Sequence, residues 1–227
     1  MRIAFTMRVV ENDSYYEIRD QISHDWIEWC TQHGYSPILL SNKLEDINQY
    51  LAESSVDAII LTGGNDVEAP VNSNGSYSLI RNLFEKTVVD YAVENHIPVL
   101  AVCRGFQFVN KYFGGSLNLD ISKNLNAQEK HVAVEHAVTL TKIFKNMFNI
   151  NNLVTNSYHN HGVFESNLAE PLVSFANSEP SGLIEAYHHK SLPIIGLQWH
   201  PERKTKSTKF DIEVLNKLIH EKTFWES

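Results

Sequence analysis

The feature that most constrains the fold is an uninterrupted apolar run over residues 97–102 (IPVLAV), which ends at Cys103. Continuous apolar strands are typical of parallel sheets covered by helices on both faces, because both sides of each strand are then buried. A second, largely apolar run over residues 56–61 (VDAIIL) ends at the turn TGGND, residues 62–66. The sequence therefore predicts a parallel sheet with two neighbouring strands that end at these turns.

Strand and helix patterns alternate along the first half of the chain. We predict strands over 2–9, 36–40, 56–61 and 97–102, and helices over 18–30, 46–53, 79–94 and 105–112. This order is typical of a doubly wound α/β fold. Beyond Ser116, short strands at 131–141, 172–176, 183–188 and 194–198 precede a helix over 208–220. We expect one domain over residues 1–227, a mostly parallel sheet flanked by helices with a small antiparallel extension.

Charge and cysteine content narrow the class of partner. Lys and Arg total 19 against 27 Asp and Glu, a net charge of −8, which disfavours a nucleic-acid partner. The sequence shows no secretory signal and no run near the 18 or so apolar residues of a membrane helix. Two cysteines in such a chain indicate a reducing compartment. We expect a cytoplasmic protein with neither nucleic-acid nor membrane partners.

Cys103 is the first candidate for chemistry. It follows a buried strand and precedes Arg104, Gly105 and a helical run, so it faces the N-terminus of a helix, where the partial positive charge favours a thiolate. This is the strand–nucleophile–helix arrangement of a nucleophile elbow, with cysteine in place of serine. The alternative is a buried cysteine that packs as a small apolar side chain, which is our interpretation of Cys30.

A base for this thiol is found in Gln198-Trp199-His200-Pro201-Glu202, directly after another apolar run. A carboxylate two residues beyond His200 can hold one ring nitrogen, so that the other can take the thiol proton. The alternative is a solvated surface turn. Acyl transfer also needs donors for the developing oxyanion, and the N–H groups of Gly64 and Arg104 are candidates, although a Gly-Gly pair alone is merely a turn.

Together, LTGGND, AVCRGFQFVNKYFGG and GLQWHPER resemble, in this order, the class I glutamine amidotransferase family, and within it the stand-alone γ-glutamyl hydrolases, including those that act on γ-glutamyl-aminobutyrate. The resemblance implies a nucleophile at Cys103, a base at His200 and an orienting acid at Glu202. It implies an oxyanion hole at Gly64 and Arg104. The expected reaction is hydrolysis of a γ-glutamyl amide through a glutamyl thioester, with release of L-glutamate.

The resemblance also implies a set of substrate-binding residues: Gln107, Asn156, Ser157, Tyr158 and His159. The sequence departs from the family pattern at Asn160 and His161, where the usual pattern is closer to His-His-Gln. Asn65 stands where the branch often has glycine, and it is expected to narrow the cleft or contact the leaving group. Arg19 lies in a segment that lines the mouth of the site or, alternatively, caps the first helix.

The identity of the leaving group is open at this point. The whole sequence is similar to hydrolases that release glutamate from a γ-glutamyl cytidine diphosphate amidate in capsule biosynthesis, so the substrate is a small γ-glutamyl amide with a nucleotide conjugate as one candidate. Five arginines could meet a pyrophosphate or serve as surface charges and structural ion pairs: Arg8, Arg19, Arg81, Arg104 and Arg203. The alternative function is a glutaminase subunit that delivers ammonia to a separate synthetase.

We expect no cofactor and no metal. A zinc site built from His159, His161, His188 and His189 is a minor alternative, because no cysteine or acidic ligand pattern accompanies them. A non-enzymatic thiol sensor would explain Cys103 but not the His200–Glu202 motif. The oligomeric state is open, with a homodimer as one alternative.

Overall fold

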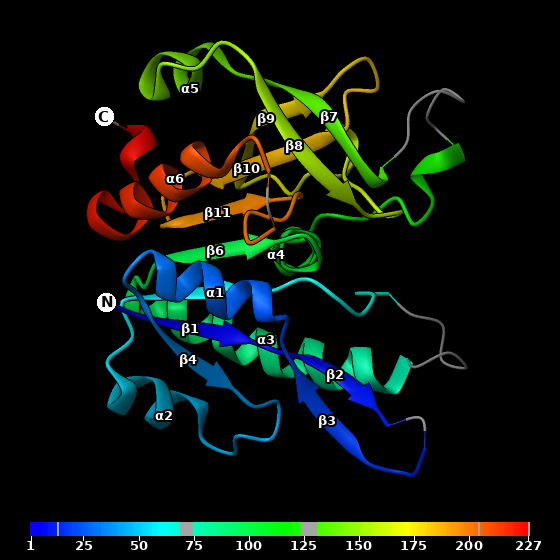
Figure 1. The fold of residues 1–227 in the computed structure, drawn as a ribbon, viewed down its shortest axis with the longest axis vertical. Helices are drawn as coiled ribbons and strands as arrows, with labels where there is room; N and C mark the ends of the chain where they lie inside the picture. Colours follow the sequence, from blue (N-terminus) through cyan, green and yellow to red (C-terminus); the bar gives the residue numbers. More distant parts are fainter. Residues whose placement is uncertain (13, 69–74, 124–130, 204, 227) are drawn as a thin grey trace.

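One nine-stranded sheet runs through the protein, as seen in a computed structural model that describes residues 1–12, 14–68, 75–123, 131–203 and 205–226 (Figure 1). Its first five strands are parallel neighbours, in the order β4 (Ser36–Leu40), β1 (Arg2–Thr6), β5 (Ala58–Leu61), β6 (Val99–Val102) and β11 (Ile194–Leu197). Four antiparallel strands continue it, in the order β10 (Ile184–His189), β9 (Leu172–Ser178), β7 (Val132–Leu140) and β8 (Leu153–Tyr158). This is the α/β sheet with an antiparallel extension that the sequence predicts.

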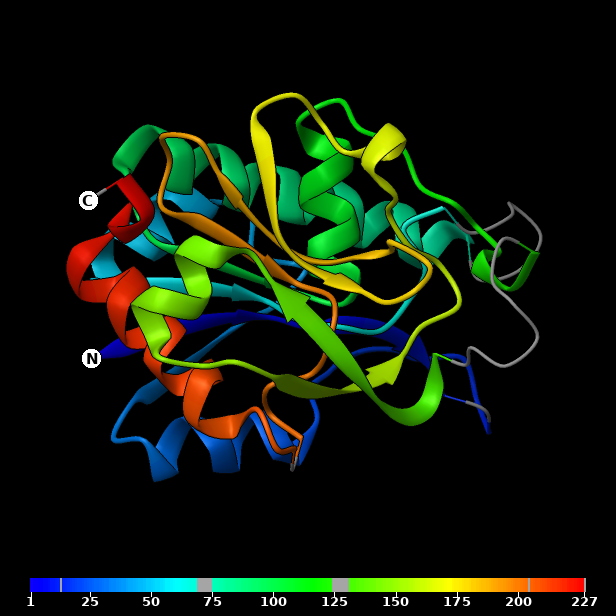
Figure 2. The same cartoon turned by 90° about the horizontal axis from the view of Figure 1, so that it is seen from above.

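Helices cover both faces of the sheet (Figure 2). One layer consists of α1 (His24–Gln32), α5 (Lys142–Phe148) and α6 (Thr208–Glu221), whose apolar side chains share one core. The other consists of α2 (Ile47–Ser54), α3 (Gly75–Asn95) and α4 (Arg104–Tyr112), which share a second core. Short 3₁₀ helices lie at Ile121–Lys123, Glu165–Asn167 and Phe224–Glu226.

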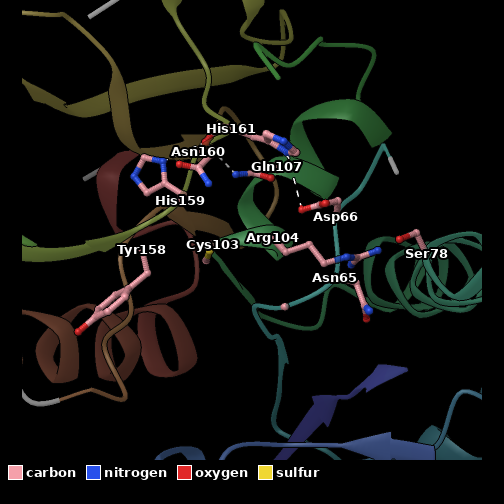
Figure 3. A pocket seen from close by; sticks show the side chains of 11 residues that line it. Asn65, Asp66, Ser78, Cys103, Arg104, Gln107, Tyr158, His159, Asn160 and His161 are labelled. Atoms are coloured by element: carbon pink, nitrogen blue, oxygen red, sulfur yellow. Dashed lines mark hydrogen bonds and ion pairs between the residues drawn. The ribbon is translucent and has the colours of Figure 1, made fainter. Parts of the chain in front are cut away.

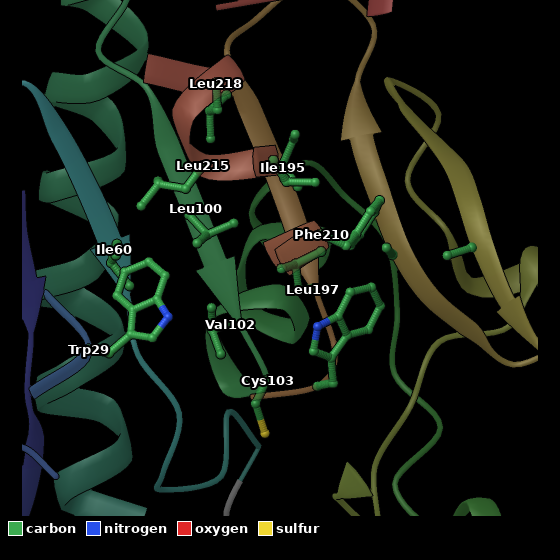
Figure 4. Close-up of a cluster of buried hydrophobic side chains, with 14 of the residues drawn as sticks. Trp29, Ile60, Leu100, Val102, Cys103, Ile195, Leu197, Phe210, Leu215 and Leu218 are labelled. Atoms are coloured by element: carbon green, nitrogen blue, oxygen red, sulfur yellow. The ribbon is translucent and has the colours of Figure 1, made fainter. Parts of the chain in front are cut away.

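Strand β6 explains why the apolar runs are continuous. Leu100 and Val102 point into the first core, beside Leu215 and Leu197 (Figure 4), whereas Val99 and Ala101 point into the second. Successive side chains of a strand face opposite sides, so a central strand under two helix layers needs an apolar residue at every position. The same alternation holds along β1, β5 and β11.

The helix predicted over 18–30 is wrong in its first part. Residues Ile18–Gln21 form β3, which pairs antiparallel with β2 (Arg8–Glu11) in a separate two-stranded sheet. The helix α1 starts only at His24, because Ser23 caps it by accepting a hydrogen bond from the Asp25 N–H. The strand predicted over 2–9 likewise divides into β1 and β2.

Two elements of the extension, α5 and β8, are absent from the sequence prediction. The segment of α5 is only seven residues long, and β8 has the polar sequence LVTNSY. Neither has the periodicity that identifies longer elements. Within the described ranges, no helix combines the length and the apolar character needed to cross a membrane.

Candidate active site

Three neighbouring strands end at the candidate site. The order β5-β6-β11 places the turn after Leu61, the residue Cys103 and the segment leading to His200 at one edge, because the carboxyl ends of parallel strands meet there. In open α/β sheets this edge is where ligands bind. The structure therefore brings together three segments that are far apart in the sequence.

Cys103 stands in an unusual backbone conformation between β6 and α4. Its φ of 52° and ψ of −100° lie in a region that L residues rarely adopt, and its N–H donates to the Leu197 carbonyl at 2.8 Å. The sharp turn thus falls on the cysteine itself. Gly105 is needed for a different reason, because a Cβ there would lie 2.4 Å from the Leu61 carbonyl oxygen. The arrangement is a strained elbow that presents the thiol at the strand end.

His200 is fixed by two polar residues. Its Nδ1 lies 2.6 Å from Oε1 of Glu202, and both side chains are buried. Its backbone N–H donates to Oδ1 of Asn156 at 2.9 Å, while Nδ2 of Asn156 donates to its carbonyl oxygen at 2.8 Å. The carboxylate selects the tautomer and the amide fixes the main chain, so the other ring nitrogen is held toward Cys103.

The charge state of His200 follows from its neighbours. Burial favours the neutral ring, but the negative charge of Cys103, the carboxylate of Glu202 and hydrogen bonds to both outweigh it and raise the pKa of His200 to about 10. His200 is thus favoured as an imidazolium, with its ring beside Cys103. A positive charge beside a cysteine is the arrangement that activates a thiol as a nucleophile.

The glycine turn lies against both catalytic candidates. A Cβ at Gly63 would lie 2.8 Å from Cε1 of His200 and 3.5 Å from Cβ of Cys103. Gly64 has a φ of 85°, which side-chain-bearing residues rarely adopt. Arg104 is the first residue of α4, so its N–H has no partner within the helix. The backbone of this turn and the start of α4 flank Cys103.

The fully buried guanidinium group of Arg81 holds the glycine turn through its carbonyl oxygens. Arg81 donates to the carbonyl oxygens of Thr62 at 2.7 Å, Gly63 at 3.0 Å and Gly64 at 2.7 Å. With the three carbonyl groups bound on this side, the orientation of the peptide groups is set. The turn is therefore a preformed element of the site.

Arg81 is one of two arginines that neutralise Glu85. The Glu85 carboxylate accepts from Thr6 Oγ1 at 2.7 Å, from Arg81 Nε at 2.9 Å and from Arg104 Nη1. Burial alone would raise the pKa of Glu85, but Arg104 and Arg81 outweigh it and hold that pKa below its usual range. Both arginines were candidates for pyrophosphate contacts or structural ion pairs, and their side chains form structural ion pairs.

Two hollows meet at Cys103. The larger, of about 480 Å³, is shown in Figure 3 and is lined by Gly64, Asn65, Asp66, Ser78, Cys103, Arg104, Gln107, Tyr158, His159, Asn160 and His161. The smaller, of about 150 Å³, lies on the His200 side and also contains Arg8, Trp26, Glu202 and Arg203. Gln107 is oriented within the larger hollow by donating to the His161 carbonyl at 3.1 Å and to Gln198 Oε1 at 3.2 Å.

Several predicted substrate-binding side chains are engaged in the protein itself. The Asn156 amide binds the His200 backbone, and Ser157 Oγ donates to the His131 carbonyl at 2.8 Å. Asn65 exchanges two hydrogen bonds of 3.0 Å with the Val9 backbone, so it ties the glycine turn to β2. Tyr158 is 41% exposed and lines both hollows. Of the predicted set, Gln107 and Tyr158 thus have side chains available at the larger hollow, whereas His159 lines it with a ring whose Nδ1 is bonded to the His161 carbonyl.

Arg19 is not brought to the site. Its side chain bonds Glu17 and the Tyr15 hydroxyl near the tip of the β2–β3 hairpin, and it lines neither hollow. Two other arginines do line the smaller hollow. The Arg8 side chain has no hydrogen-bond or ion-pair partner among the described residues, and Arg203 lies over the Tyr158 ring at 4.0 Å. Both were among the five arginines named from the sequence, and only the fold shows that these two line the smaller hollow together.

The four histidines of the alternative zinc site are not gathered. His188 packs against Trp225 and Phe144, and His189 packs against Phe113. The ring nitrogen Nδ1 of His161 lies 4.0 Å from Asp66 at the pocket rim. Only His159 belongs to a cluster of metal-binding residue types in the described part of the chain.

Comparison with known proteins places this geometry in context. The family model described as Peptidase C26 matches residues 3–202. The γ-glutamyl-CDP-amidate hydrolase of Campylobacter jejuni subsp. jejuni serotype O:2 is 31% identical over 207 residues, covering 90% of this chain and 91% of that protein. One subunit of the glutamine-hydrolysing GMP synthase of Methanococcus vannielii is 28% identical over 165 residues, covering 73% and 72%.

The fold is also found among solved structures. A structure described as a GMP synthase subunit from Thermoplasma acidophilum superposes with a TM-score of 0.66 at 18% identity, covering 96% of this chain and 92% of that one. At this identity the likeness concerns the fold alone. It confirms the α/β class predicted from the sequence.

Proposed function

The chain belongs to the Peptidase C26 family of class I glutamine amidotransferase-like proteins, and from this premise we propose that it hydrolyses γ-glutamyl amides with Cys103 as nucleophile. The observation that carries the proposal is the adjacency of Cys103, a His200 held at 2.6 Å by Glu202, and a glycine turn packed against both. Family and relatives support an amide-cleaving enzyme. The assignment of each residue's role is our inference from the geometry.

The reaction proceeds in two steps. The Cys103 thiolate attacks the γ-carbonyl carbon, and the N–H groups of Gly64 and Arg104 receive the developing oxyanion. His200 gives its proton to the departing nitrogen as the C–N bond breaks, which leaves a glutamyl thioester. A water molecule, deprotonated by His200, then attacks the thioester carbonyl. The C–S bond then breaks, glutamate and the Cys103 sulfur separate, and His200 keeps the proton taken from water for the next turnover.

The two hollows divide the substrate at Cys103. The larger hollow, with Gln107 and the backbone around Tyr158, holds the α-amino and α-carboxylate groups of the glutamyl moiety. The smaller hollow then receives the leaving group on the side of His200, which must protonate it. Arg8 and Arg203 line this second space, so it favours an anionic leaving group. Arginine is well suited to bind phosphate oxygens.

The most specific candidate substrate is a γ-glutamyl cytidine diphosphate amidate, which would give glutamate and cytidine diphosphoramidate for capsule biosynthesis. Support comes from the name of the Campylobacter relative and from the two arginines beside the leaving-group position. The second candidate is a glutaminase subunit for a separate synthetase, and the similarity to the Methanococcus GMP synthase favours it.

A panel of γ-glutamyl amides distinguishes these substrates. Purified protein is given glutamine, γ-glutamyl-aminobutyrate, a neutral γ-glutamyl anilide and γ-glutamyl-CDP-amidate, and free glutamate is measured as kcat/KM. We expect the phosphorylated amide to be preferred over the neutral one by at least about 10²-fold. Equal rates would contradict the anionic leaving group, and activity on glutamine that depends on an added synthetase would favour the alternative.

Substitution of the arginines tests the division of the site. Arg8→Gln and Arg203→Gln should each lower kcat/KM for the phosphorylated amide by about 10-fold or more, while the rate with the neutral anilide changes little. Arg2→Gln is the matched control, because the Arg2 side chain bonds the Ser54 carbonyl at the protein surface. Cys103→Ala should abolish glutamate release from every substrate in a folded protein. Retained activity there would overturn the proposed nucleophile.

A further inference from the structure

A second cluster of titratable side chains lies behind the wall of the larger hollow, and the proposed hydrolysis does not use it. Ring nitrogens of His131 and His159 and a carboxylate oxygen of Glu185 all lie within 4.8 Å of one another, and all three residues are buried. His136 also approaches, with Nε2 at 3.7 Å from Glu185 Oε1. The cluster joins β10 to the ends of the β7–β8 pair.

The side-chain carboxylate of Glu185 has no hydrogen-bond partner within the described residues. Its side chain is fully buried, and both carboxylate oxygens lack a donor. Ring nitrogens of His131, His136 and His159 lie at 3.6, 3.7 and 3.9 Å from Oε1, beyond the roughly 2.7–3.2 Å of a hydrogen bond. A buried carboxylate without a compensating cation is costly. These distances leave room for a positive species between the groups.

The tautomer of His159 indicates what that species is. Nδ1 of His159 lies 2.9 Å from the His161 carbonyl, to which it donates. Nε2 therefore carries a lone pair. It is buried, has no hydrogen-bond partner among the described residues, and faces the Glu185 oxygen. A backbone carbonyl that holds one ring nitrogen while the other faces inward is the usual outer arrangement around a metal-binding histidine.

The spacing also fits a metal ion. Zinc binds histidine nitrogen and carboxylate oxygen at about 2.0–2.2 Å, so its tetrahedral ligands lie roughly 3.3 Å apart. The two nitrogen–oxygen separations of 3.6 and 3.9 Å are close to this value. We propose that His131, His159 and Glu185, with His136 as a fourth ligand, form a site for a divalent transition-metal ion, with Zn²⁺ as its occupant.

The ligands determine what the ion would do. Nitrogen and carboxylate donors without thiolate suit Zn²⁺ among the common metals. Glu185 belongs to β10, whereas His131 precedes β7 and His159 follows β8. The ion therefore links the outer pair of strands to β10, and β8 carries the Asn156 that clamps the His200 backbone. Its role is to hold this part of the sheet in place, without taking part in amide cleavage.

Metal content tests the proposal directly. The full chain without an affinity tag, carrying Cys103→Ser so that this thiol cannot bind metal, is dialysed against Zn²⁺ and then against buffer. Elemental analysis should give about one zinc per chain. Replacement by Co²⁺ should give visible absorption of nitrogen–oxygen ligation without a thiolate charge-transfer band. A chain that retains neither metal overturns the proposal and shows that a proton alone occupies the cluster.

Two variants locate the ion. Glu185→Gln and His159→Gln should weaken zinc binding by at least about 100-fold, whereas His220→Gln, an exposed histidine on α6, should retain it. Zinc should also raise the Tm of the Cys103→Ser chain but not of the two variants. Stoichiometric zinc in both variants would place the ion elsewhere and overturn the assignment. If a variant does not fold, the Co²⁺ spectrum of the Cys103→Ser chain decides. None of these readouts depends on hydrolysis, so the proposed function can fail independently.

Discussion

The site has a nucleophile side, formed by Cys103 and the glycine turn, and a base side, formed by His200 and the β7–β8 strands next to it. One fully buried glutamate lies behind each side, and the two glutamates have different surroundings. Glu85, beneath the glycine turn and Cys103, accepts hydrogen bonds from Thr6, Arg81 and Arg104. Glu185, behind the base side, has three histidines near its carboxylate, which has no hydrogen-bond donor among the described residues. The nucleophile side is thus complete as the chain alone, whereas the base side is completed by a cation.

The largest expected loss of catalytic rate follows from substitution of Glu202, which holds the proposed base His200. Glu202→Gln should lower kcat by about 10³- to 10⁴-fold, because an amide no longer stabilises the imidazolium or selects its tautomer. Steady-state kinetics with a γ-glutamyl amide measures it. Glu94→Gln, at an exposed position of α3, is the control. A loss below about 10-fold would show that Glu202 does not orient His200.

The next prediction concerns the free energy of unfolding and compares substitutions of Glu85 and Glu185. Glu85→Gln should lower the free energy of unfolding by about 3–5 kcal/mol, because two buried guanidinium groups lose their shared carboxylate. Glu185→Gln in chelator-treated protein should cost less than about 1 kcal/mol or stabilise the fold. Burial raises the pKa of Glu185, so the substitution replaces a carboxyl group that has no hydrogen-bond donor among the described residues with a neutral amide of the same shape. Chemical denaturation measures both. Equal losses would contradict the difference between the two regions.

A smaller loss of stability is expected on substitution of Asn156, whose amide makes two hydrogen bonds to the His200 backbone. Asn156→Ala removes both hydrogen bonds to that residue and should cost about 1–3 kcal/mol of stability. If Asn156 acts by positioning the base, kcat should fall while KM stays nearly constant. A rise in KM at constant kcat would instead show that Asn156 binds substrate, as the sequence resemblance implies. Asn146→Ala, on α5, serves for comparison.

The smallest change is a shift in titration. NMR of ¹³C-labelled histidine should find His200 protonated up to about pH 10 and losing its proton above it, because Cys103 and Glu202 stabilise the imidazolium. In Cys103→Ala one negative charge and one hydrogen bond are gone, while burial still favours the neutral ring. The midpoint should then fall by about one unit or more. An unchanged midpoint would show that Cys103 carries no charge in the resting protein.

Elements buried on both faces could be predicted from the sequence. Strands such as β6 have apolar residues at every position, and the glycines and polar residues at their ends identify the edge where Cys103 and His200 meet. The hairpin β2–β3 could not be predicted, because Ile18, Ile22 and Trp26 follow a helical period although Ile18 pairs with Glu11. Its register depends on a partner strand rather than on local pattern.

The polar supports of the site were the least predictable part. Arg81, Glu85 and Glu185 sit within helix and strand patterns where a charged residue is usually solvent-exposed. Two of the three partners of Glu85, Arg104 and Thr6, lie 19 and 79 positions away in the sequence. The burial of Glu185 depends on the β7–β8 pair. The resemblance pointed to Asn156, but only the fold shows that its amide faces the His200 backbone.

The backbone at Cys103 has a consequence for how this sequence can change with time. A φ of 52° with a ψ of −100° is far more comfortable for glycine than for any residue with a Cβ. Drift under selection for folding alone would therefore favour glycine at this position, and the resulting protein would be more stable and inert. A cysteine in this backbone conformation therefore carries a cost in stability that a need for its thiol would explain and that packing alone does not.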